Sequence, residues 1–214
     1  MSGGNNDIKI AIVTDNNDKR STYAQQKVRY KRAIKGGFYY EALLIDYALM
    51  EDRLKSFLYH AGVILDMDSK RIDCKKSIRP YIKDIYSAFS KEKDRMPSFN
   101  NISGKVDMIR ALFAWSTTAT EIPDDNPYLK MLKEQCESVD IGYMLEVFEK
   151  VDDWCKYRNE IIHSLMQKNM DSLNSEIKSR AEEGMDFANA LDSFVKDMKK
   201  GNKVRKAAGL KTEK

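Results

Sequence analysis

The residues best suited to chemistry stand close together in one short segment, Arg158-Asn159-Glu160-Ile161-Ile162-His163. Histidine ionises near neutral pH, so it can either accept or donate a proton. Arginine keeps its charge at all relevant pH values, and its planar guanidinium matches the geometry of a phosphate group. Asn159 and His163 are four residues apart, which places them on one face of a helix. This combination indicates chemistry at a phosphate.

The helix that must position these residues is predicted over about 140–168, because its apolar residues recur at alternating spacings of four and three. The members of this stripe are Met144, Phe148, Val151, Cys155, Arg158, Ile162 and Leu165. Arg158 is its one polar member, and a buried guanidinium is costly unless it is paired. Arg158 therefore either pairs with a core-facing carboxylate, such as Glu41 or Asp46, or faces a groove that binds a ligand.

The segment 158–163 resembles the Arg-x(4–6)-His signature of HEPN domains (higher eukaryotes and prokaryotes nucleotide-binding). The polar residue after the arginine and the apolar pair before the histidine also fit that pattern, although they assign no subfamily. The resemblance implies an all-α, HEPN-like bundle over roughly 38–198. Many HEPN proteins are metal-independent ribonucleases of toxin–antitoxin, abortive-infection and CRISPR-associated systems, and they act as homodimers. By this resemblance we expect a bacterial defence or toxin–antitoxin endoribonuclease, with an antitoxin or another defence protein as a possible partner.

The chemistry of the residues agrees with that expectation. RNA is cleaved without a metal when its 2′-hydroxyl attacks the adjacent phosphorus, which requires a base, an acid and positive charge near the phosphate. We assign His163 as general acid or base, Arg158 as phosphate ligand and Asn159 as an orienting residue. Since one motif supplies one histidine and one arginine, a two-fold homodimer would supply both halves. The nearby aromatic residues Trp154 and Tyr157 could stack on a base.

Two other interpretations stay open. The chain could be a non-catalytic HEPN-like module that binds RNA or a protein partner, or a plain helical adaptor in which Arg158 forms a structural ion pair. The sequence contains no recognisable set of metal ligands and no glycine-rich phosphate loop. We therefore expect neither a metal ion nor another cofactor.

The pattern along the whole chain is helical. We predict a polar lead-in over 1–17, one domain over 18–200 and a basic tail over 201–214. Within the domain, a basic helix at 18–35 precedes a bundle of five or six helices. The last helix has small and apolar residues at regular spacings, typical of close helix packing. Its stripe consists of Ile177, Ala181, Gly184, Ala188, Leu191, Val195 and Met198.

Charge is distributed unevenly. The net charge is only +4, but 18–35 and 199–214 each hold seven Lys or Arg against a single acidic residue, so the body over 36–198 is acidic. The basic end is either a solubilising tail or an arm that attracts RNA through its phosphates. The residues predicted to contact RNA there are Lys199, Lys200, Lys203, Arg205 and Lys206.

The cysteines and the hydropathy indicate the compartment. Cys74, Cys136 and Cys155 are odd in number and widely spaced, which suits a reducing environment rather than a disulfide framework. The first residues lack the pattern of a signal peptide, and no apolar run is long enough to span a membrane. We therefore predict a cytoplasmic protein without a membrane partner.

Overall fold

The structure is a computed structural model of the chain, which describes residues 16–90, 96–123, 125–164 and 170–212. The regular elements of these residues are helices. The one β-bridge among the described residues is isolated and joins Ile64 to Asp73. The all-α class is therefore confirmed. Most of the predicted lead-in, residues 1–15, lies outside the described residues. The helices are α1 (Asn16–Gly36), α2 (Tyr39–His60), α3 (Arg79–Phe89), α4 (Ile102–Thr118), α5 (Pro127–Glu137), α6 (Ile141–Ser164), α7 (Met170–Lys199) and α8 (Lys203–Ala207).

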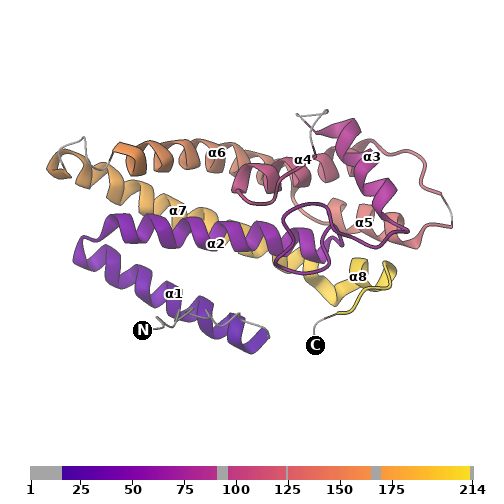
Figure 1. Cartoon of the computed structure of the whole chain (residues 1–214), viewed down its shortest axis with the longest axis horizontal. Helices are drawn as coiled ribbons and strands as arrows, with labels where there is room; N and C mark the ends of the chain where they lie inside the picture. Colours follow the sequence, from indigo (N-terminus) through magenta and orange to yellow (C-terminus); the bar gives the residue numbers. More distant parts are fainter. Residues whose placement is uncertain (1–15, 91–95, 124, 165–169, 213–214) are drawn as a thin grey trace, which may run out of the picture.

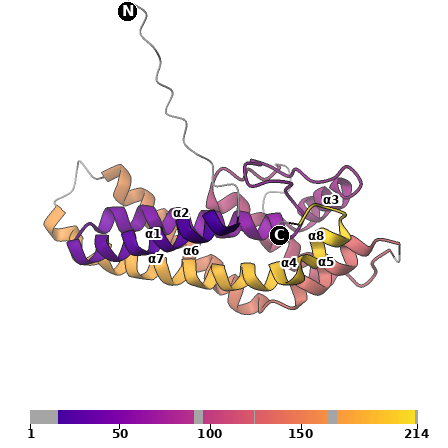
Figure 2. The same cartoon turned by 90° about the horizontal axis from the view of Figure 1, so that it is seen from below.

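The four longest helices run alongside one another in the order α1, α2, α7 and α6 (Figure 1). The shorter helices α3, α4, α5 and α8 gather at one end of this layer. Figure 2 shows the same arrangement from below, with α1 lying along α2 and α7. The α1–α2 turn lies at the opposite end, where α6 ends and α7 begins. The candidate residues on the last turns of α6 therefore lie away from the cluster of short helices.

Helix α2 is the centre of the core because it packs against α1, α4 and α7. Twelve of its 22 residues are buried, and they lie on more than one side of the helix. A helix that is covered on several sides does not need a single apolar stripe. Its apolar residues Leu43, Met50, Leu54 and Leu58 are all buried.

The predicted stripe of α7 is confirmed, since all seven of its members are buried. This seam faces α2, and the contact between α2 and α7 is the most extensive in the molecule. Gly184 permits the close approach: a Cβ at this position would lie 2.7 Å from Cζ2 of Trp154 and 2.9 Å from Oδ2 of Asp46. Because Gly184 has no side chain, α2, α6 and α7 can approach one another closely at this position.

Two glycines end helices. Gly37 has φ +75° and follows α1, where the N–H of Phe38 donates to the carbonyl of Ala33 at 2.8 Å. Gly62 also has φ +75° and follows α2, where the N–H of Val63 donates to the carbonyl of Leu58 at 3.0 Å. Glycine adopts this left-handed conformation without a steric penalty, so both helices stop and the chain turns.

The structure corrects the prediction of a basic tail over 201–214, because this region includes a helix that packs on the bundle. A short 3₁₀ turn at Lys200–Asn202 follows α7, and α8 then packs against α5. Val204 and Ala208 are four residues apart and both are buried, so this segment has an apolar face of its own. The lysines dominate its composition and obscure that face in the sequence.

Three further observations concern chemistry and environment. Cys74 and Cys136 are buried, Cys155 is half-buried, and all three are free thiols. Among the helices that the structure describes, none is both long and apolar enough to cross a membrane. The described His, Cys, Asp and Glu side chains form no group of three that could hold a metal ion.

Candidate active site on α6

Helix α6 carries the three residues predicted to be catalytic. It begins after Asp140, whose Oδ1 accepts a hydrogen bond from the N–H of Tyr143 at 3.0 Å and so caps the first turn. Met144, Phe148 and Val151 are buried as the stripe predicts. Beyond them the prediction fails in part: the fully buried positions are Trp154 and Ile161, while the stripe members Cys155, Arg158 and Ile162 are half-buried. Leu165 lies outside the described residues.

Arg158 therefore lies at the edge of the buried face rather than in its middle. Because the side chain is only half-buried, its charge is not fully removed from water. Its guanidinium lies 4.4 Å above the ring of Tyr47 on α2, in a cation–π contact. Its Nη1 donates to Oδ1 of Asn159 at 3.0 Å, while its buried Nε has no hydrogen-bond partner in the part of the chain that the structure describes. Tyr47 and Asn159 thus hold the arginine side chain in place.

The carboxylates considered as structural partners of Arg158 are engaged differently. Glu41 pairs with Arg29 at 2.6 Å. Asp46 is completely buried, and neither of its oxygens has a hydrogen-bond partner among the described residues. Within the described part of the chain, no carboxylate forms an ion pair with Arg158. The guanidinium therefore keeps a positive charge that no described side chain neutralises.

His163 is exposed in the last turn of α6, and Asn159 is exposed one turn before it. The predicted common face of Asn159 and His163 is consistent with this arrangement. Five residues correspond to about 140° of rotation around an α-helix, so His163 and Arg158 leave the helix in different directions. One copy of α6 thus presents an imidazole and a guanidinium on different faces at the same end of the helix.

Tyr47 is the residue of this site that the sequence analysis missed, since it looked like an ordinary core aromatic of α2. It is half-buried. Burial and the nearby Glu51 raise the pKa of Tyr47, whereas Arg158 acts in the opposite direction. Its hydroxyl therefore stays protonated near neutral pH, and its ring is a neutral platform for the arginine.

The prediction that Trp154 stacks on a base is wrong for the folded chain. Trp154 is fully buried, and its indole N–H donates to the carbonyl of Arg180 at 2.7 Å. It anchors α6 to α7 beside Gly184. Tyr157 is half-buried, with the guanidinium of Arg180 lying 4.8 Å from its ring centroid. Burial and Glu176 raise the pKa of Tyr157 to about 12.

The predicted RNA contact of Arg205 is also wrong. This side chain is buried, and its guanidinium lies 3.6 Å from the ring centroid of Tyr59. It donates to the carbonyls of Tyr59 at 2.7 Å, Ile64 at 3.3 Å and Lys211 at 3.0 Å. Arg205 therefore fastens α8 to the end of α2. Of the remaining predicted contacts in this region, Lys200, Lys203 and Lys206 are exposed and Lys199 is half-buried.

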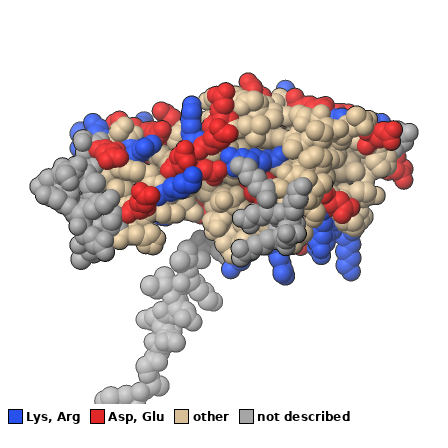
Figure 3. Space-filling model, turned by 90° about the horizontal axis from the view of Figure 1, so that it is seen from above, with Lys and Arg blue, Asp and Glu red and all other residues tan. Residues whose placement is uncertain are grey.

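The surface around these elements carries charges of both signs. On the face seen in Figure 3, acidic and basic side chains are interspersed over the described residues. On α6 itself, the exposed Lys156 pairs with Asp153 at 3.0 Å. Local groups such as Arg158, rather than a broad basic field on that face, would have to attract a phosphate.

Comparison of the chain with protein-family models, with curated proteins and with solved structures finds no match.

Proposed function

We propose that the chain is an endoribonuclease that cleaves RNA without a metal ion, in the setting implied by its HEPN resemblance, bacterial defence or a toxin–antitoxin pair. The observation that carries this proposal is the state of Arg158. Its guanidinium is held by Tyr47 and Asn159, has no described carboxylate partner, and shares the end of α6 with the exposed His163. A fixed, uncompensated guanidinium beside an accessible imidazole is suited to chemistry at a phosphodiester.

The reaction follows from these groups. A base removes the proton of the 2′-hydroxyl, the 2′-oxygen bonds to phosphorus, and the 5′-oxygen leaves with a proton from an acid. The products are a 2′,3′-cyclic phosphate and a 5′-hydroxyl. A neutral His163 imidazole can serve as the base and a protonated one as the acid. The Arg158 guanidinium would stabilise the charge that develops on the phosphorane oxygens.

A homodimer supplies the groups that one chain lacks. One chain has one motif histidine, whereas the reaction uses a base and an acid. Arg158 and His163 also point about 140° apart around α6, so one copy of the helix does not direct both toward one point. Two α6 helices related by a two-fold axis would bring two imidazoles and two guanidiniums to one cleft.

The test is RNA cleavage in the presence of EDTA by the wild type, Arg158→Ala and His163→Ala, with analysis of the product ends. We expect each substitution to lower the cleavage rate roughly 100-fold or more. Lys156→Ala is the matched control, because Lys156 is an exposed cation of the same helix that pairs with Asp153. Circular dichroism and sedimentation equilibrium would verify that helicity and dimerisation are unchanged.

Each alternative gives a different result. Cleavage that survives both substitutions would overturn the assignment of these residues. RNA binding by the wild type without any product would instead support a non-catalytic binding module. A monomer at the concentrations of the assay would overturn the two-fold site. If Arg158 were only structural, Arg158→Met would leave cleavage intact.

A further inference from the structure

A separate cavity of about 530 Å³ lies between α1, α2 and α7. Its volume is within the range of small-molecule pockets, roughly 300 to 1,000 Å³. None of the motif residues Arg158, Asn159 and His163 lines it. It includes the buried side chains of Ser56 and His60 near the end of α2. The cavity is thus a feature of the fold distinct from the candidate active site.

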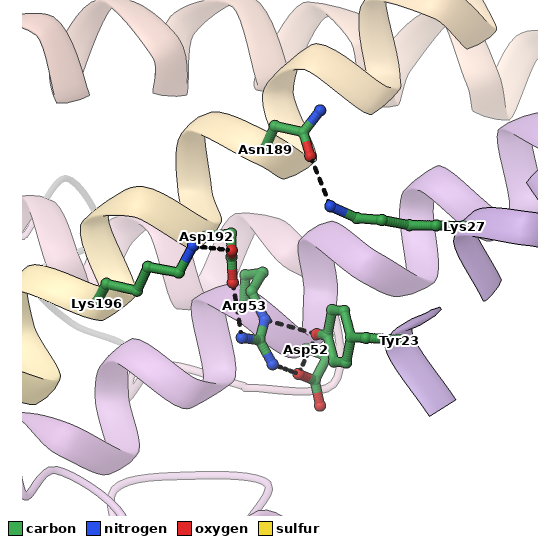
Figure 4. Close-up of polar contacts among 7 residues, drawn as sticks. All are labelled: Tyr23, Lys27, Asp52, Arg53, Asn189, Asp192 and Lys196. Carbon is green, nitrogen blue, oxygen red and sulfur yellow. Dashed lines mark hydrogen bonds and ion pairs between the residues drawn. The ribbon is translucent and has the colours of Figure 1, made fainter. Parts of the chain in front are cut away.

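Arg53 of α2 lines this cavity and is hydrogen-bonded to three other residues that line it (Figure 4). Its Nε donates to the hydroxyl oxygen of Tyr23 at 2.6 Å, its Nη2 donates to Asp52 at 2.6 Å, and its Nη1 donates to Asp192 at 3.0 Å. Asp192 also pairs with Lys196 at 2.8 Å. These contacts join α1, α2 and α7, and they make this lining a preformed part of the structure.

The charges that line the cavity do not balance. Asp52 and Asp192 are its acidic residues, and both are engaged by Arg53 or Lys196. Three further cations line it, Arg20, Lys27 and Lys199, and none of them pairs with a carboxylate in the described part of the chain. Lys27 donates to the neutral Asn189 at 3.0 Å.

We propose that this cavity binds a small organic phosphate monoester. Three uncompensated cations suit the double negative charge of a monoester, and lysine and arginine are the usual phosphate ligands of proteins. The hydroxyl of Ser56 and the imidazole of His60 provide polar groups on the α2 side of the cavity. The proposal does not depend on the ribonuclease function.

Binding would fix the first half of α1. Among the described side chains of α1, only Tyr30 and Ala33 are buried, and both lie in its second half. The first half is joined to the rest by the polar contacts of Tyr23 and Lys27. A ligand that bridges Arg20 and Lys27 on α1 to Lys199 on α7 would add ionic contacts where apolar packing is sparse. We therefore expect the ligand to slow hydrogen exchange in residues 20–30.

The experiment is calorimetric titration of the full chain with ribose 5-phosphate at low ionic strength, with ribose as the uncharged control. We expect binding of ribose 5-phosphate and none of ribose. Lys199→Gln should weaken binding roughly tenfold, and the double variant Lys27→Gln/Lys199→Gln should weaken it further. Lys130→Gln/Lys206→Gln is the matched control, because it removes the same charge from exposed residues that do not line the cavity.

The outcomes separate the possibilities. A tenfold loss confined to the cavity variants, together with slower exchange in 20–30, supports the proposal. Equal losses in the two double variants would show general charge attraction and overturn it. Absence of binding at millimolar ribose 5-phosphate would also overturn it. A single-stranded RNA oligonucleotide that binds more tightly than ribose 5-phosphate, and loses affinity in the cavity variants, would assign the site to RNA instead.

Discussion

Asp46 makes the stability of this fold depend on pH in a direction opposite to that of most carboxylates. The side chain is completely buried between α2 and α7, and neither carboxylate oxygen has a hydrogen-bond partner. Burial, with a contribution from Asp186, raises the pKa of Asp46 from 3.8 to about 8. The folded chain thus holds this proton more tightly than the unfolded chain does. Its stability should fall as the pH rises from about 4 to about 8.

The size of the effect follows from the shift. Each pKa unit corresponds to 1.36 kcal/mol, so ionisation of Asp46 should lower the free energy of unfolding by about 3–4 kcal/mol between pH 5 and pH 8. That is a large share of the roughly 5–15 kcal/mol that stabilises a typical domain. Asp46→Asn keeps the shape of the side chain but cannot ionise. We expect its stability to be independent of this titration, so that its advantage over the wild type grows by about 3–4 kcal/mol between pH 5 and pH 8.

The assay is urea unfolding followed by circular dichroism at pH 5, 6, 7 and 8. Asp153→Asn is the control, because Asp153 is exposed and its substitution should change stability by less than about 0.5 kcal/mol at each pH. The decisive quantity is the difference between Asp46→Asn and the wild type as a function of pH. A constant difference would show that Asp46 does not titrate in this range and would refute the reasoning.

Three more predictions concern packing and the candidate site. Gly184→Ala should lower the free energy of unfolding by about 1–3 kcal/mol in urea unfolding, because its Cβ would meet the ring of Trp154 at 2.7 Å. Arg205→Met should cost about 3 kcal/mol or more, since it leaves several carbonyls without their donor. Calorimetry and faster proteolysis of the C-terminal segment would show this loss. Tyr47→Phe should retain RNA cleavage, whereas Tyr47→Ala should lower kcat/KM roughly tenfold, because Tyr47 contacts Arg158 through its ring and not through its hydroxyl.

The helices could be predicted well because their apolar periodicity is strong. The predicted seam of α7 is correct at every position. Here the local pattern and the packing agree, so the sequence carries the information directly.

The errors arise where packing between distant segments decides the outcome. Trp154 is near the motif in sequence, but α7 covers it and supplies the carbonyl that its indole requires. Arg205 looks like one more cation of a basic tail. In the structure it is buried and donates hydrogen bonds to carbonyls at the end of α2. Tyr47 belongs to the candidate site only because α2 passes beneath Arg158. No local sequence pattern predicts such contacts, because they depend on how the helices are arranged in space.

The contact between Arg205 and Tyr59 has a consequence for synthesis of the protein. The two residues are 146 positions apart, and α2 also has its main partner, α7, in the last part of the chain. Until α7 has been translated, the apolar surface of α2 that packs against α7 stays exposed. Such exposed segments are prone to aggregate. The core closes only when the final helices emerge. A chain truncated before α8 would lack this closure and would leave the carbonyls at the end of α2 without the donors of Arg205.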